Sequence, residues 1–186
     1  IMNYKKMSLR ALMLGFMAVL FAGFTSCSSS DDDENKTVEE NNAPTSGVLS
    51  CSFEPSEDEL ALCNITAEYT DASGKIQTEE ITGKWEKNIT FTTLPTKVSV
   101  TLKHSLKANV ELSKESYHFG GLWDDVVYAI KKDGSKYWPI QMGPRLIHNN
   151  AVGKAKVEDF ITRTAVLKTI SYTISNKPNE DGSYIY

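Results

Sequence analysis

Hydrophobic and polar residues alternate along several segments of the chain after residue 60. In segment 63–70 the apolar residues Cys63, Ile65 and Ala67 fall on one side of an extended backbone, and polar residues fall on the other. This alternation predicts a half-buried β-strand. Alternation, or a dense run of β-branched and aromatic residues, predicts further strands at 75–82, 84–93, 97–103, 108–113, 125–131, 136–142 and 165–174.

Turn residues separate these segments. Segment 71–74, Asp-Ala-Ser-Gly, predicts a hairpin between the first two strands, and Asp133-Gly134 predicts a second hairpin between 125–131 and 136–142. Pro139 has no backbone N–H, so we expect its strand to lie at a sheet edge or to carry a bulge. Helical spacing occurs at 155–163, where a short helix and a loop are both compatible with the pattern.

About seven to nine short strands with regular turns are typical of a β-sandwich, immunoglobulin-like in the broad sense. A closed barrel is the alternative arrangement. The chain has 186 residues, of which 40% are hydrophobic and 10% aromatic, so one all-β domain with a substantial core is expected, with at most one short helix. We expect this domain to occupy residues 48–186.

The first 26 residues have the composition of a targeting segment. Lys5, Lys6 and Arg10 precede a run of fourteen uncharged residues, 11–24. As a helix rising about 1.5 Å per residue this run would span about 21 Å, less than the ~30 Å hydrocarbon core of a membrane. A secretory signal peptide at 1–26 is therefore favoured over a retained membrane anchor.

The residues that follow this segment, Thr25-Ser26-Cys27, resemble the lipobox of bacterial lipoproteins. The resemblance implies that Cys27 is acylated and becomes the first residue of the mature chain. The next residues resemble the surface-export signal of Bacteroidetes lipoproteins, a serine and acidic run directly behind the lipidated cysteine: Ser30, Asp31, Asp32, Asp33 and Glu34. Together they imply a lipid anchor, an acidic flexible tether at 27–47, and a location in the outer membrane facing the cell exterior.

The charge balance narrows the range of partners. The chain carries 20 basic and 24 acidic residues, a net charge of −4. Removing residues 1–26 takes away three basic and no acidic residues, which leaves 17 basic against 24 acidic residues and a net charge of −7. Proteins that bind nucleic acid need an excess of Lys and Arg to neutralise phosphates, so nucleic acid is excluded as an expected partner.

The cysteines and histidines suggest a disulfide but no metal site. With Cys27 assigned to the lipid, Cys51 and Cys63 remain in an oxidising compartment, and a disulfide between them is predicted. Two packed, reduced thiols are the alternative. The three histidines show no metal-ligand spacing, and His104 is expected at the surface. We identify no metal site and no cofactor.

Aromatic residues gather between positions 117 and 138. Sugars present apolar C–H faces and hydroxyl edges, so Trp123, Asp124, Trp138 and Gln141 could form a glycan-binding platform. The alternative is that the tryptophans belong to the core. Asp124 and Asp125 fall on opposite faces of a strand and so cannot form a catalytic carboxylate pair, and no catalytic residue is assigned.

The chain resembles small surface lipoproteins of Bacteroidetes that carry a β-sandwich behind an acidic tether, and such proteins are often accessory to polysaccharide capture or adhesion. We therefore expect a non-catalytic binding module with a glycan as ligand. The alternative is a structural or assembly subunit that binds a surface protein through an edge strand, and a glycan hydrolase ranks third.

Overall fold

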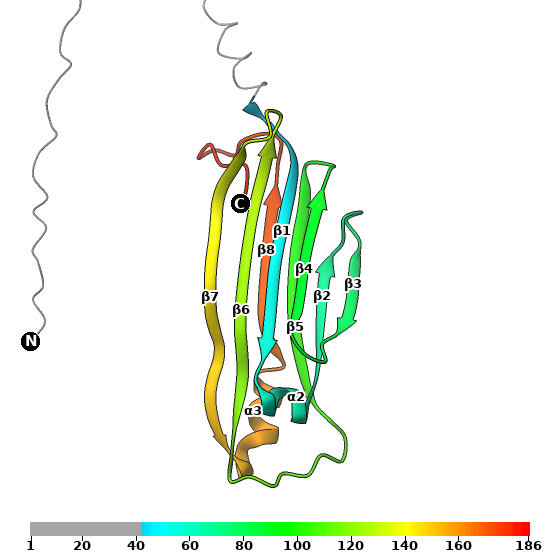
Figure 1. Ribbon diagram of the computed structural model, residues 1–186, viewed down its shortest axis with the longest axis vertical. Coiled ribbons are helices and arrows are strands. Elements are labelled where there is room, and N and C mark those ends of the chain that lie inside the picture. The colour runs from blue at the N-terminus through cyan, green and yellow to red at the C-terminus, as the bar shows by residue number, and fades with distance from the viewer. Residues whose placement is uncertain (1–41) are drawn as a thin grey trace, which may run out of the picture.

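Two antiparallel sheets packed face to face form the protein, as seen in the computed structural model, which describes residues 42–186 except for the side chains of residues 138, 139, 141 and 149. The sandwich is elongated, and two short helices lie together at one end of it (Figure 1). The predicted all-β sandwich is confirmed. The predicted signal peptide, the lipidation site Cys27 and the acidic run behind it lie outside the described residues.

Eight strands and two α-helices make up the domain within the described part of the chain. In chain order they are β1 (Pro44–Pro55), α2 (Glu57–Leu62), β2 (Cys63–Thr70), β3 (Ile76–Glu80), β4 (Trp85–Phe91), β5 (Thr96–Leu106), β6 (Ser116–Lys131), β7 (Lys136–Gly153), a 3₁₀ turn (Lys154–Lys156), α3 (Val157–Arg163) and β8 (Val166–Ile174). Both predicted hairpins are present, as β2–β3 and β6–β7.

The strands divide into two sheets of four. Sheet A has the order β4-β1-β6-β7, and sheet B has the order β3-β2-β5-β8. At the centre of sheet A, β1 and β6 pair so that Phe53 lies opposite Trp123 and Ser52 lies opposite Asp124. Because successive side chains alternate between faces, the first pair lies on one face of the sheet and the second pair on the other.

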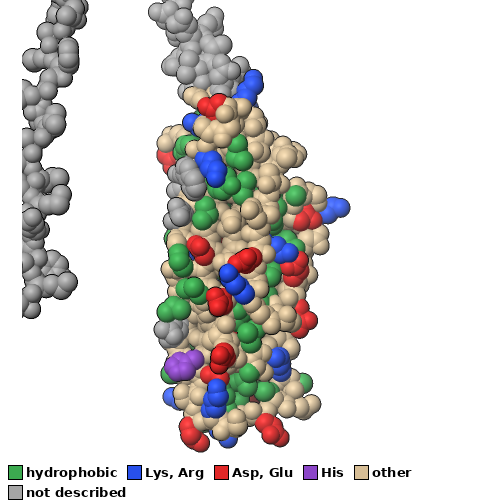
Figure 2. All heavy atoms as spheres, viewed as in Figure 1, with side chains coloured by type: hydrophobic (Ala, Val, Ile, Leu, Met, Phe, Trp, Pro, Cys, Tyr) green, Lys and Arg blue, Asp and Glu red, His purple; other side chains and the backbone are tan. Residues whose placement is uncertain are grey.

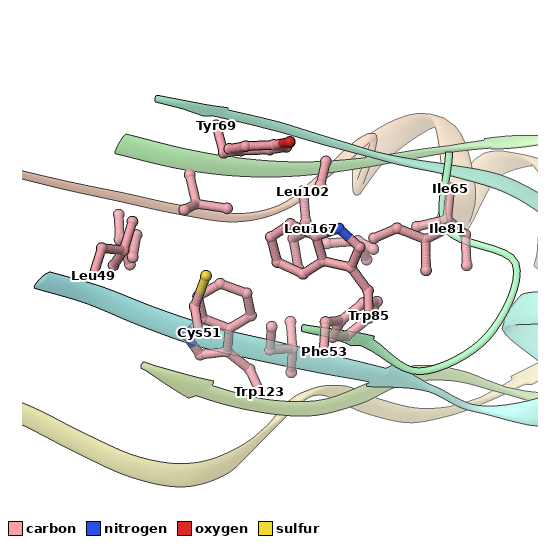
Figure 3. Close-up of a cluster of buried hydrophobic side chains, with 14 of the residues drawn as sticks. Leu49, Cys51, Phe53, Ile65, Tyr69, Ile81, Trp85, Leu102, Trp123 and Leu167 are labelled. Atoms are coloured by element: carbon pink, nitrogen blue, oxygen red, sulfur yellow. The ribbon is translucent and has the colours of Figure 1, made fainter. Parts of the chain in front are cut away.

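The core fills the space between the sheets. Cys51, Phe53 and Trp123 extend from sheet A towards Ile65 and Leu102 of sheet B (Figure 3). Phe53, Trp123 and Leu102 have no exposed surface. Burial of such large apolar side chains contributes roughly 1.5–3 kcal/mol each and is the main force that holds the two sheets together.

Some predicted boundaries are corrected by the structure. Segment 108–113 is not a strand but part of the loop that crosses from β5 in sheet B to β6 in sheet A. Its alternation arises because Val110 and Leu112 pack against the core at the end of the sandwich. The first strand begins at Pro44, earlier than the expected domain start at residue 48. Helix α3 confirms the helical alternative at 155–163, and α2 was not predicted.

Pro139 lies on β7, which is an edge strand of sheet A, as its missing N–H predicted. On the opposite side of the sandwich the edge strands β3 and β4 are joined by Glu79. Its carboxylate accepts hydrogen bonds from Tyr69 Oη at 2.8 Å, Trp85 Nε1 at 3.0 Å and Lys87 Nζ at 2.6 Å. The bonds from Lys87, Trp85 and Tyr69 lower the pKa of Glu79 from 4.5 to about 2.

Substituting Glu79→Gln should reduce the acid sensitivity of folding. A carboxylate whose pKa is lowered in the folded state contributes stability above its unfolded pKa and loses it as the pH falls. The wild type should therefore lose stability between about pH 4.5 and about pH 2, and the variant should lose less. At neutral pH the variant should be less stable by at most about 1 kcal/mol, because the group is partly exposed to solvent.

Urea unfolding of both chains across this pH range measures the effect. Glu80→Gln, a neighbouring exposed carboxylate on β3, is the control and should follow the wild type. Identical pH profiles for the wild type and Glu79→Gln would contradict the stabilising role of Glu79.

Candidate functional site

Trp123 is a core residue and not part of an exposed binding platform. It lies on the inner face of β6 with no exposed surface, and its Nε1 donates a hydrogen bond to Asp125 Oδ1 at 2.6 Å. In Figure 3 its ring lies among the core side chains beside Cys51. The predicted role of Trp123 in stacking against a sugar is therefore corrected: the same alternation that puts Phe53 inside puts Trp123 inside.

Asp125 is buried behind Trp123 and connects the two sheets. It also accepts hydrogen bonds from Arg145 Nη2 on β7 and from Tyr172 Oη on β8, each at 3.2 Å. Burial and the negative charge of Asp125 raise the pKa of Tyr172 to about 12, so this hydroxyl stays protonated and remains a donor. Asp124 and Asp125 lie on opposite faces of β6, as predicted, with Asp125 inward and Asp124 outward, so their carboxylates do not share one site.

Asp124 lines a hollow on the outer face of sheet A, which we call the polar hollow. Its volume is about 420 Å³. Most of the side chains that line it carry hydroxyl, amide or charged groups. The lining residues are Ser50, Cys51, Ser52, Glu86, Lys87, Asn88, Asp124 and Val126. Asp124 Oδ1 is buried and has no hydrogen-bond partner among the residues that the structure describes. The polar hollow thus brings the Asp124 carboxylate together with hydroxyl and amide groups of β1 and β4.

A second hollow, which we call the apolar hollow, continues along β1 and β6 towards α2. Its volume is about 360 Å³ and its lining includes Glu54, His118, Leu122 and Leu146. The register places Glu54 opposite Leu122, and Leu122 opposite Leu146. Leu122 is 41% exposed and Leu146 is 61% exposed. The outer face of sheet A therefore presents polar groups beside exposed aliphatic ones.

The space-filling view shows this mixture on the side of the molecule where β7 lies. Hydrophobic side chains are interspersed there with acidic and basic ones (Figure 2). The other two predicted ligand residues, Trp138 and Gln141, belong to β7. Gln141 pairs with Val126, which lines the polar hollow, so its backbone lies next to this site. The side chains of Trp138 and Gln141 are outside the described part of the structure.

The predicted disulfide is not formed. Cys51 and Cys63 are both free and buried. Cys51 lies within β1 of sheet A, and Cys63 opens β2 of sheet B, where its neighbour is Glu59. Burial, followed by the nearby charge of Asp125, raises the pKa of Cys51 to about 12. The two thiols are therefore separate core residues, which is the alternative that the sequence left open.

A third group of polar side chains was missed by sequence analysis. Glu59 of α2 and His104 of β5 have fully buried side chains, and His104 Nδ1 is hydrogen-bonded to Glu59 Oε1. The expectation that His104 lies at the surface is thus wrong. Its strand alternates, and position 104 continues the inward series Val98, Val100 and Leu102. Extending that alternation past residue 103 would have placed it in the interior.

Comparison of the chain with protein-family models, with curated proteins and with solved structures found no match. Among the described residues, no helix is long and apolar enough to cross a membrane.

Replacing Trp123 should test its placement in the core. Trp123→Ala removes a fully buried indole and leaves Asp125 without one donor, so we expect a loss of about 3–5 kcal/mol in the free energy of unfolding. Leu146→Ala, an exposed apolar residue on the adjacent strand, should change stability by less than about 0.5 kcal/mol. Denaturant unfolding measures both. A loss below about 1 kcal/mol for Trp123→Ala would place the ring at the surface.

Proposed function

We propose that the protein is a non-catalytic binding module anchored by lipid to the outside of the bacterial outer membrane, and that its ligand is a glycan held along the outer face of sheet A. The observation that carries this proposal is the polar hollow, whose lining brings the Asp124 carboxylate together with Ser50, Ser52 and Asn88. In this proposal Cys27 carries the lipid and the acidic residues behind it direct export.

The polar hollow offers the chemistry that sugar hydroxyls need. A sugar hydroxyl both donates and accepts, and the serine hydroxyls and the Asn88 amide can do the same. The carboxylate of Asp124 accepts only, and hydrogen bonds to a charged acceptor are stronger than those to neutral ones. A glycan hydroxyl that donates to the Asp124 carboxylate would therefore form a charge-assisted hydrogen bond, and this supports a ligand rich in hydroxyl groups.

The apolar hollow supports an extended ligand. Leu122 and Leu146 expose aliphatic surface next to Glu54, in a hollow whose lining residues follow those of the polar hollow along β1. The C–H face of a sugar ring can cover such aliphatic groups while its hydroxyls remain with the polar side chains. A chain of two or more sugar units fits this alternation better than a wholly apolar ligand, for which the polar hollow would be costly to desolvate.

Binding to an array of bacterial, plant and host glycans, followed by calorimetry with the best ligand, tests the proposal. Asp124→Asn should weaken binding by about tenfold or more, because it removes a charge-assisted hydrogen bond worth roughly 1.5–3 kcal/mol. Glu158→Gln, which removes one exposed carboxylate on α3, should leave the affinity unchanged. Equal affinities for the wild type and Asp124→Asn, with both variants folded, would contradict the proposal, as would the absence of any glycan ligand.

An assembly role is the second candidate, and one observation favours it. β7 is 18 residues long, and within the described chain it pairs through only one of its edges, with β6. A free edge can accept a strand from another protein by β-augmentation. Affinity purification from outer membranes separates the two functions. A protein recovered in equal amount with the wild type, and lost when β7 is blocked by proline substitution at Leu146, would favour assembly over glycan binding.

A further inference from the structure

The end of the sandwich that carries the helices contains a buried cluster of three potential metal ligands. Glu59 comes from α2, Cys63 opens β2 and His104 lies near the end of β5. One ligand atom from each residue lies within 4.8 Å of the other two. The side chains of Glu59 and His104 have no exposed surface, and Cys63 is 3% exposed. The three side chains of the cluster are therefore shielded from solvent.

Hydrogen bonds around the cluster fix the orientation of the histidine. The Thr164 hydroxyl donates to the Phe160 carbonyl at 2.8 Å, so its oxygen is left to accept from His104 Nε2–H at 3.0 Å. The other ring nitrogen, Nδ1, faces Glu59 Oε1, to which it is hydrogen-bonded. This arrangement is the one found at metal centres, where a ligating histidine donates its second N–H to a neighbouring group.

The glutamate is held in a similar way. Its Oε2 accepts from the Gly120 N–H at 3.0 Å, while Oε1 faces His104. Gly120 has a φ of +114°, and a Cβ at this position would lie 1.9 Å from the Ile147 carbonyl oxygen, so glycine is required for the backbone to approach. Glu59 Oε2 and His104 Nε2, which point away from the cluster, are therefore hydrogen-bonded to other parts of the protein. Glu59 Oε1 and His104 Nδ1 point into the cluster and face each other.

We propose that Glu59, Cys63 and His104 bind a divalent cation of the zinc class. Carboxylate oxygen, thiolate sulfur and imidazole nitrogen are the three ligand types that Zn²⁺ takes in proteins, and a water molecule can fill the fourth position. One carboxylate and one thiolate balance the two positive charges of the cation. The complete site is therefore neutral, as a fully buried site needs to be.

Cation binding would displace the proton of the Cys63 thiol, because the thiolate is the form of cysteine that binds a metal. The bound cation would then join α2 to both strands of sheet B that meet there, and would act as a structural centre.

Metal analysis of the purified, reduced chain tests this proposal. We expect about one Zn²⁺ per chain, and a higher unfolding temperature with Zn²⁺ than after treatment with a chelator. Replacing Zn²⁺ by Co²⁺ should produce a thiolate-to-cobalt charge-transfer band in the near ultraviolet. The absence of bound metal, together with an unfolding temperature that Zn²⁺ does not change, would overturn the proposal and leave a hydrogen-bonded cluster only.

Two variants locate the metal. Cys63→Ser should abolish the cobalt charge-transfer band and lower the affinity for Zn²⁺ at least tenfold, and His104→Gln should lower the affinity similarly. Cys51→Ser is the matched control, because Cys51 is also a buried free thiol but lies outside the cluster. It should keep the band unchanged. A band that survives Cys63→Ser, or that disappears in Cys51→Ser, would overturn the assignment. Circular dichroism establishes that each variant is folded.

Discussion

The pairing register of β1 and β6 is the constraint on which the rest of the structure depends. With Phe53 opposite Trp123, these central strands of sheet A direct large apolar side chains into the sandwich. The same register sets Ser52 opposite Asp124 on the outer face, where the polar hollow lies. Side chains on a strand alternate with a period of two. A one-residue shift in the register of one strand would therefore turn its apolar side chains outward and its polar side chains inward, which would disrupt both the core and the polar hollow.

Two buried carboxylates add hydrogen bonds between different elements of the sandwich. Asp125 joins β6 and β7 of sheet A to Tyr172 on β8, and Glu59 joins α2 to β5 and to the backbone of β6. Each buried carboxylate has several donors, as the cost of removing a charge from water requires. These groups stabilise the fold, whereas Asp124 faces outward, and its Oδ1 has no hydrogen-bond partner among the described residues. This difference separates the structural carboxylates from the one that we assign to ligand binding.

Local patterns in the sequence were enough to predict the fold class, both hairpins and the edge position of Pro139. They could not decide whether Trp123 faces the core, because the apolar alternation of β6 begins at Tyr117, before the segment that the pattern delimited. Helix α2 was predictable in principle, since Ser56 and Glu59 have the spacing of a helix N-cap. The Glu59, Cys63 and His104 cluster was not, because only the pairing of β2 with β5 brings His104 beside the other two.

Glycan recognition on the outer face of sheet A is the central functional claim of this account. The most direct test is an NMR titration of the folded chain with a glycan ligand, followed through its backbone amides and tryptophan indoles. The account predicts shifts concentrated at Ser50, Ser52, Leu122 and Asp124, while the buried Trp123 indole stays unchanged. Shifts confined to sheet B, or a large response of the Trp123 indole without changes along β1, would contradict it.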